Sequence, residues 1–228
     1  MVGKFKIAGL VSLTLAIAGL CASQVRVSPA ALVVLDAAKT PPAKTSPLIP
    51  PGWQLKTNAG FPNITFSDQG DQSAFHFRSD KSSFGLERAV DIDPSQLPYL
   101  NWRWKVTQLP RGGDFRHSST DDQAAQVLVA FDDRHIITYL WDSTAPQGTM
   151  ESASSLPLVH IYAVVCRSGA NDINQWLQES RNIAADYQHA FGKAPTHVKG
   201  VRLQINSQHT GTTAESYFGE VAFRSAQL

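Results

Sequence analysis

Residues 99–106 read YLNWRWKV, and this stretch decides the fold class. Leu100, Trp102, Trp104 and Val106 alternate with polar residues, so their side chains lie on one face of an extended strand. Two tryptophans between aliphatic residues at strict alternation indicate a face that packs on a core. We therefore expect both rings to be buried.

Shorter stretches with the same two-residue period recur at 74–79, 85–92, 123–131, 136–141, 160–166, 201–205 and 216–223. Clusters of Asp, Gly, Pro and Ser separate these stretches and are typical of turns. About eight short strands with turn signals between them predict a mainly β protein, an antiparallel β-sandwich of jelly-roll type, rather than alternating strands and helices.

One segment departs from this period and predicts a single short helix near the C-terminal third. Asn182 is a favourable N-cap residue, Ile183 and Tyr187 follow at helical spacing, and Gly192 is a natural helix terminator. The preceding residues, 176–181, fit either a strand or a helix.

The composition fits one folded domain and argues against binding to nucleic acid. Of the 228 residues, 43% are hydrophobic and 17% are charged, proportions typical of a globular domain with a core. The 20 Lys and Arg residues stand against 19 Asp and Glu residues and form no basic run, so we expect no electrostatic surface for nucleic acid.

The first 22 residues have the pattern of a cleaved signal peptide. Lys4 and Lys6 precede residues 7–20, IAGLVSLTLAIAGL, an uncharged apolar run shorter than the ~20 residues of a membrane span. Small residues around Ala22 offer a cleavage site, which predicts a periplasmic or secreted protein. No second long apolar run follows, so we expect no transmembrane span in the mature chain.

The number of cysteines in the mature chain depends on whether this leader is removed. A lipoprotein would be acylated at Cys21, but Leu20 is bulky where lipoprotein signals have a small residue. After cleavage only Cys166 remains, so we expect no intramolecular disulfide and a fold held by packing. The alternation around Cys166 predicts a buried structural residue rather than a nucleophile.

Residues 23–51 carry six prolines and predict an extended linker, interrupted by a brief apolar stretch at 31–35. The folded domain should begin near Gly52. The predicted organisation is a signal peptide over 1–22, a linker over 23–51 and a single β-sandwich domain over 52–228.

Six motifs in order resemble the bacterial family DUF3047, a domain of unknown function: ERAVDIDPSQLPYLNWRWKV, DDQAAQVLVAFD, TYLW, RSG, WLQESRNIAADYQHAFG and TGTTAESYFGEVAF. The resemblance spans about residues 52–224. It implies an exported protein and a fold rather than a chemistry, because the family has no assigned activity. Family members have aspartates just before the Thr-Gly pair, whereas residues 206–211 here read NSQHTG.

Two carboxylates are the candidates for catalysis. Asp122 follows Asp121 just before a predicted strand, where it either caps a polar turn or projects into a ligand cleft. Asp122 and Glu179 could form the carboxyl pair of a glycan hydrolase only if the fold brings them close, to about 5 to 5.5 Å in a retaining enzyme.

Aromatic and charged residues are the candidates for binding. Tyr139, Trp141, Trp176 and Tyr187 could form a stacking surface for a sugar, although Tyr139 and Trp141 equally fit the core face of a strand. A charged group of Arg167, Glu179, Arg181 and Asp186 either fixes the loop before the helix or recognises an anionic ligand.

These observations favour a non-catalytic exported module that binds a carbohydrate or cell-envelope glycan. Its candidate ligand-binding residues are Asp122, Tyr139, Trp141, Arg167, Glu179 and Arg181. The alternatives are an envelope glycan hydrolase or lyase using Asp122 and Glu179, or a scaffold protein without a small ligand. The seven histidines form no metal-binding motif, and no nucleotide-binding or nucleophile motif occurs, so we expect neither metal nor cofactor. The sequence carries no signal for the oligomeric state.

The leader makes a testable prediction. Because a charged start, an apolar run and small residues precede Ser23, mature protein from the envelope fraction should begin near Ser23. N-terminal sequencing checks this. An intact Met1 in the cytoplasm would contradict it, and an acylated Cys21 would identify a lipoprotein instead.

Overall fold

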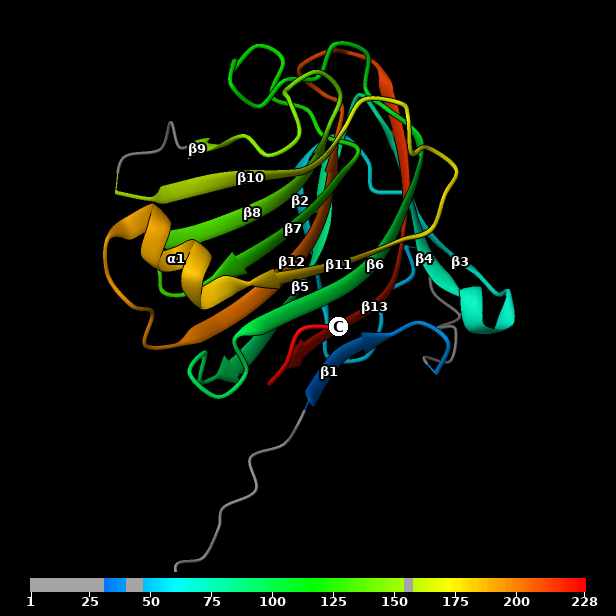
Figure 1. The fold of residues 1–228 in the computed structure, drawn as a ribbon. Helices are drawn as coiled ribbons and strands as arrows, with labels where there is room; N and C mark the ends of the chain where they lie inside the picture. Colours follow the sequence, from blue (N-terminus) through cyan, green and yellow to red (C-terminus); the bar gives the residue numbers. More distant parts are fainter. Residues whose placement is uncertain (1–30, 40–46, 154–157) are drawn as a thin grey trace, which may run out of the picture.

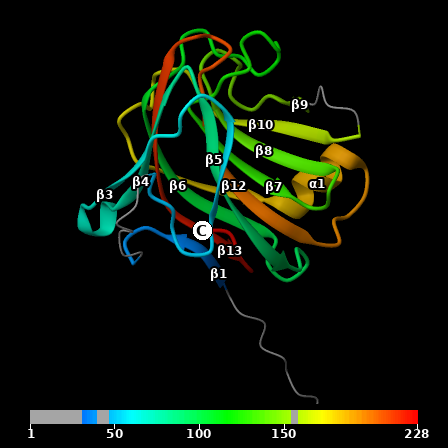
Figure 2. The ribbon, with the colours of Figure 1, turned by 180° about the vertical axis from the view of Figure 1, so that it is seen from behind.

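A computed structural model describes residues 31–39, 47–153 and 158–228, which form two β-sheets packed face to face (Figures 1 and 2). The predicted signal peptide and much of the predicted linker lie outside the described residues. The β-sandwich predicted from the alternating stretches is confirmed.

The six-stranded sheet has the order β11(Leu177–Asn182), β6(Tyr99–Gln108), β13(Thr213–Arg224), β4(Ala74–Asp80) and β3(Ile64–Ser67), with β1(Ala31–Asp36) also paired to β13. The seven-stranded sheet has the order β2(Gln54–Ala59), β5(Ser83–Ile92), β12(Val198–Asn206), β7(Ala125–Ala130), β8(His135–Asp142), β10(His160–Ser168) and β9(Met150–Ser152). The predicted antiparallel pairing is confirmed for the pairs of the described strands other than β8–β10, which is parallel.

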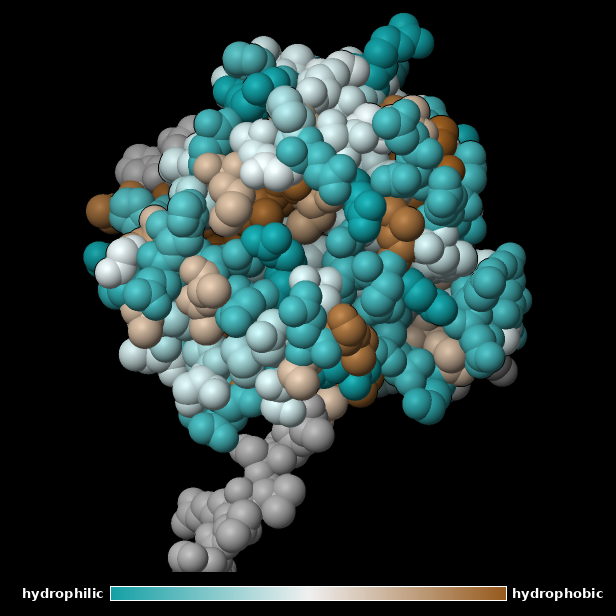
Figure 3. Space-filling view, viewed as in Figure 1, coloured by the Kyte–Doolittle hydropathy of each residue, from teal (hydrophilic) through white to brown (hydrophobic). Residues whose placement is uncertain are grey.

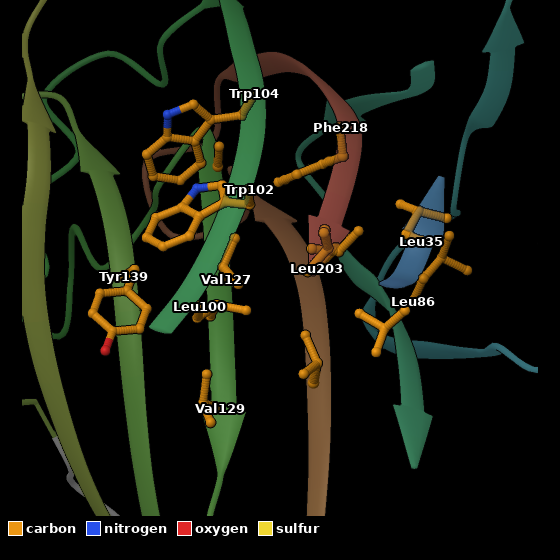
Figure 4. Close-up of a cluster of buried hydrophobic side chains, with 14 of the residues drawn as sticks. Leu35, Leu86, Leu100, Trp102, Trp104, Val127, Val129, Tyr139, Leu203 and Phe218 are labelled. Carbon is orange, nitrogen blue, oxygen red and sulfur yellow. The ribbon is translucent and has the colours of Figure 1, made fainter. Parts of the chain in front are cut away.

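The core lies between the sheets, and its largest side chains come from β6 and β8 (Figure 4). Trp102 and Trp104 are both 0% exposed, which confirms the assignment of their strand face. Their rings meet edge to face with centroids 5.3 Å apart. Trp102 also packs on Tyr139 at 5.1 Å and Trp104 on Trp141 at 5.9 Å, so four large rings join the two sheets.

The predicted helix is confirmed as α1(Ile183–Phe191). The side chain of Asn182 accepts a hydrogen bond from the backbone N–H of Ala185 at 3.0 Å, and Gly192 ends the helix with a φ of 72°. Tyr187 packs on Phe131 at 4.4 Å, so the helix covers part of the seven-stranded sheet that the other sheet leaves open. The ambiguous residues before the helix form β11, which pairs with β6.

The sandwich begins earlier in the chain than Gly52, which corrects the predicted linker at residues 31–36. These residues form β1 because they contain no proline and can pair with β13. The indole of Trp53 donates to the carbonyl oxygen of Val34 at 3.3 Å, and the guanidinium of Arg88 donates to the same oxygen.

Cys166 is buried, as its strand position predicts, and burial raises the pKa of its thiol well above the usual value. A thiol that stays protonated inside the core is a packing residue rather than a nucleophile.

The packing of the four large rings predicts how much stability is lost when one of the two tryptophans of β6 is truncated. Trp102→Ala or Trp104→Ala should each lower the free energy of unfolding by about 3 to 5 kcal/mol, because each leaves a large cavity between the sheets. Denaturant unfolding measures this loss. Trp176→Ala is the matched control, since this ring is only half-buried and its truncation should cost less. Equal losses for all three variants would contradict the central role of the cluster.

Candidate functional site

The charged residues singled out in the sequence meet where β11 of one sheet faces β10 of the other. Glu179, whose side chain is 12% exposed, accepts a hydrogen bond from Nε of Arg167 at 2.7 Å. It also accepts one from the indole nitrogen of Trp104 at 3.2 Å. The bond to Glu179 raises the pKa of Arg167, so this guanidinium stays ionised.

A second pair joins β11 to the helix. Arg181 donates to both carboxylate oxygens of Asp186, with Nη2–Oδ1 and Nε–Oδ2 distances of 2.6 and 3.0 Å. The hydroxyl of Tyr139 donates to the same carboxylate at 2.9 Å. Burial raises the pKa of Tyr139 well above its usual value, so its phenol remains a proton donor.

The structure thus gathers five of the six predicted binding residues along one seam, namely Tyr139, Trp141, Arg167, Glu179 and Arg181. Arg167 binds Glu179, Tyr139 and Arg181 bind Asp186, and the indole of Trp141 donates to the Gly169 carbonyl oxygen, which supports the loop-fixing interpretation of the charged group. Figure 3 shows a largely hydrophilic surface in this view, with apolar residues exposed in a small recess over β8 and β10.

The aromatic candidates do not form an open stacking surface. Tyr139 and Trp141 are both 0% exposed because strand alternation points them between the sheets. Tyr187 lies on the buried face of α1, against Phe131. Trp176 lies half-buried at the six-stranded sheet, where Arg103 and Lys105 stand 4.7 and 5.2 Å from the ring centroid.

Asp122 occupies a different place from Glu179. Its carboxylate is 0% exposed and accepts hydrogen bonds from the backbone N–H groups of His209 at 3.2 Å and Thr210 at 2.6 Å. Asp122 therefore anchors the turn between β12 and β13, a role that its position before a strand did not predict. Asp122 and Glu179 share no hydrogen-bond donor among the described residues.

The outer face of the seven-stranded sheet carries a groove of about 290 Å³ that sequence analysis missed. Its floor is a row of small residues in register across three strands: Ala89 on β5, Gly200 on β12 and Ala130 on β7. Ile136 on β8 continues the row beside Ala130. Small side chains between larger neighbours leave a depression that runs across the strands, which lie side by side in Figure 2.

Two positions along the strands, on the same face of the sheet, lies a second row made of Glu87, Arg202 and Leu128. This row forms one wall of the groove. The guanidinium Nε of Arg202 donates to Glu87 at 3.0 Å, and Lys56 lies 3.6 Å from the same carboxylate.

Beyond this wall a polar strip continues along the sheet. Gln204 donates to Gln126 at 3.4 Å and accepts from Asn58 at 3.5 Å. The wall and the strip therefore present carboxylate, guanidinium and amide groups beside an apolar floor.

No motif in the sequence marks this groove. Ala89, Ala130 and Gly200 lie far apart in the chain, and each alone only weakens a strand pattern. Their alignment depends on the register of three strands, which the two-residue period does not specify across strands.

Within the described ranges, no three His, Cys, Asp or Glu side chains are grouped so that they could hold a metal ion. No helix among the described residues is long and apolar enough to cross a membrane.

A family model, DUF3047, described as a protein of unknown function, matches residues 52–222. No curated protein matches the chain.

Solved structures show a similar fold. A xyloglucanase domain of NopAA, an effector from Sinorhizobium fredii solved with cellobiose, has 10% identity and a TM-score of 0.51, with 83% of this chain and 100% of that chain covered. An endoglucanase from Rhodothermus marinus has 8% identity and a TM-score of 0.47, with coverages of 87% and 99%. A family 11 carbohydrate-binding module from Clostridium thermocellum has 9% identity and a TM-score of 0.42, with coverages of 86% and 96%.

The contacts of Asp122 make a testable prediction. Asp122→Ala should lower the free energy of unfolding by about 1 to 3 kcal/mol, because two backbone N–H groups lose their buried acceptor. Asp122→Asn should cost less, since the amide oxygen still accepts. Denaturant unfolding gives the loss, and faster hydrogen exchange at Thr210 locates it. Asp80→Ala, at an exposed aspartate, is the control; an Asp122→Ala loss no larger than this control would remove the anchoring role.

Proposed function

We propose that this chain, which belongs to the DUF3047 family of proteins of unknown function, is an exported protein that binds a glycan without cleaving it. The binding site is the groove on the outer face of the seven-stranded sheet. The observation that carries this proposal is the pairing of an apolar floor with a polar wall along one groove.

The groove offers what a sugar ring requires. The C–H groups of a sugar pack on an apolar surface, which Leu128, Ala130 and Ile136 supply, while its hydroxyls need paired donors and acceptors. Arg202 and Glu87 supply a donor and an acceptor in fixed positions, because each holds the other. The volume of about 290 Å³ is at the lower end for ligand sites, which fits a shallow open groove.

The similar structures support the fold and no more, since their identities are about 10% or lower. The signal-peptide pattern of the first 22 residues supports export, where a cell-envelope glycan would be accessible.

Binding without cleavage is favoured by the state of the carboxylates. Glu179 is held by Arg167 and Trp104, and Asp122 by two backbone N–H groups. A general acid must be free to exchange its proton with substrate, and neither Glu179 nor Asp122 lies in the groove. The carboxylates that do line it, Glu87, Asp132 and Asp133, are paired with Arg202, His135 and Lys199.

Filling the groove tests the proposal. Gly200→Val adds a side chain where a Cβ would meet only the Arg88 carbonyl at 3.5 Å and the Ala130 side chain at 4.0 Å, so the strand should tolerate it. Calorimetric titration against a panel of envelope and plant glycans should show binding by the wild type and at least about tenfold weaker binding by Gly200→Val. Thr65→Val, exposed on β3 of the other sheet, is the matched control and should bind as the wild type does.

The same titrations separate the alternatives. Product analysis on each mixture should find the glycan intact. Released fragments that disappear in Asp122→Asn or Glu179→Gln would instead identify a hydrolase or lyase. Equal binding by the wild type and Gly200→Val would move the site elsewhere, and no heat with any glycan would favour the scaffold alternative.

A further inference from the structure

The ionisable side chains that line the groove are already paired with other groups of the protein. Glu87 binds Arg202 at 3.0 Å, and Asp133 faces Lys199 at 3.5 Å. Asp132 holds the ring of His135, which approaches its two carboxylate oxygens at 2.9 and 2.8 Å.

The remaining cation of the lining, Arg88, is directed to another element. Its guanidinium donates to the carbonyl oxygen of Val34 on β1. Because the Arg88 guanidinium is directed away from the groove, the charges that face it are three carboxylates, Glu87, Asp132 and Asp133, and two cations, Lys199 and Arg202. Lys56 lies 3.6 Å from Glu87 and His135 binds Asp132, so each carboxylate of the lining has a basic partner.

A lining whose charges are already paired with one another disfavours a charged ligand. An anionic group would have to displace Glu87 from Arg202 or lie beside that carboxylate. A cationic group would have to displace Arg202 from Glu87 or lie beside that guanidinium. An uncharged hydroxyl can accept from or donate to the outer side of an existing pair without breaking it.

The direction of the groove sets the length of the ligand. The floor row runs across β5, β12, β7 and β8 rather than along any one of them. Four adjacent strands span three interstrand spacings of about 4.8 Å, or roughly 14 Å in total. A pyranose ring is about as long as one spacing, so the floor accommodates roughly three rings in a row.

We propose that the groove selects an uncharged glycan chain of about three or more sugar residues, lying across the strands. This inference rests on the proposed function and adds the charge and length of the ligand.

A panel of oligosaccharides tests both properties. Neutral and uronic-acid oligosaccharides of several linkages, each from one to six residues long, are titrated into the full mature chain. Gly200→Val serves to identify the binding that uses the groove. We expect groove-dependent binding of a neutral series, with affinity rising at least about tenfold up to about three residues and then levelling. This binding should change little between 50 and 500 mM salt, because no net charge is involved.

A variant that removes one charge of the lining tests the preference for uncharged ligands from the opposite direction. Glu87→Gln removes the partner of Arg202 and should give the groove a measurable affinity for a uronic-acid oligosaccharide that the wild type lacks. Glu215→Gln is the matched control, because Glu215 pairs with His76 on the other sheet, and it should leave uronic-acid binding unchanged.

The outcomes distinguish the two proposals. Groove-dependent binding of an acidic series by the wild type overturns the charge inference, and equal affinity for one and three residues overturns the length inference, while both leave glycan binding intact. Absence of groove-dependent binding to any member of the panel removes the proposed function and this inference with it.

Discussion

The packing of Trp102 and Trp104 of one sheet against Tyr139 and Trp141 of the other is the contact on which the rest of this structure depends. Four large rings with little exposed area set the spacing of the sheets and determine which face of each strand points inward. An unpaired buried donor is costly, and the polar atoms of Trp104, Tyr139 and Trp141 each have a hydrogen-bond acceptor, whereas the indole nitrogen of Trp102 has none among the described residues.

The cost of an unpaired donor explains the charged seam. The indole of Trp104 donates to Glu179 and the hydroxyl of Tyr139 to Asp186, while the indole of Trp141 donates to the Gly169 carbonyl. Each of the two carboxylates in turn binds an arginine. The charged residues thus complete the aromatic core at its edge, and the aromatic rings that could have stacked on a sugar are used to hold the sheets together.

The sequence predicted most reliably those features that depend on one segment alone. The alternation around Trp102, the caps of α1 and the burial of Cys166 are local patterns, and the structure confirms all three. The strands that were missed, β1, β2, β3 and β9, are short, and the polar stretch QLKTNA of β2 has little periodicity. Such edge strands form because a neighbouring strand offers hydrogen bonds, which a local pattern does not show. The groove was missed for the same reason, since its floor exists only through the register of β5, β12 and β7.

Topology also decides where the groove ends. Because β8 and β10 are parallel, the chain between them must cross over rather than turn back directly. Part of this crossover packs on the outer face of the seven-stranded sheet, where a second apolar cluster forms from Phe115, Leu140, Ala145, Ala163 and Val165. That cover closes part of the outer face, and the open groove occupies the part where the floor residues are small. The outer face of this sheet is therefore covered where the second apolar cluster forms and open where the small floor residues line the groove.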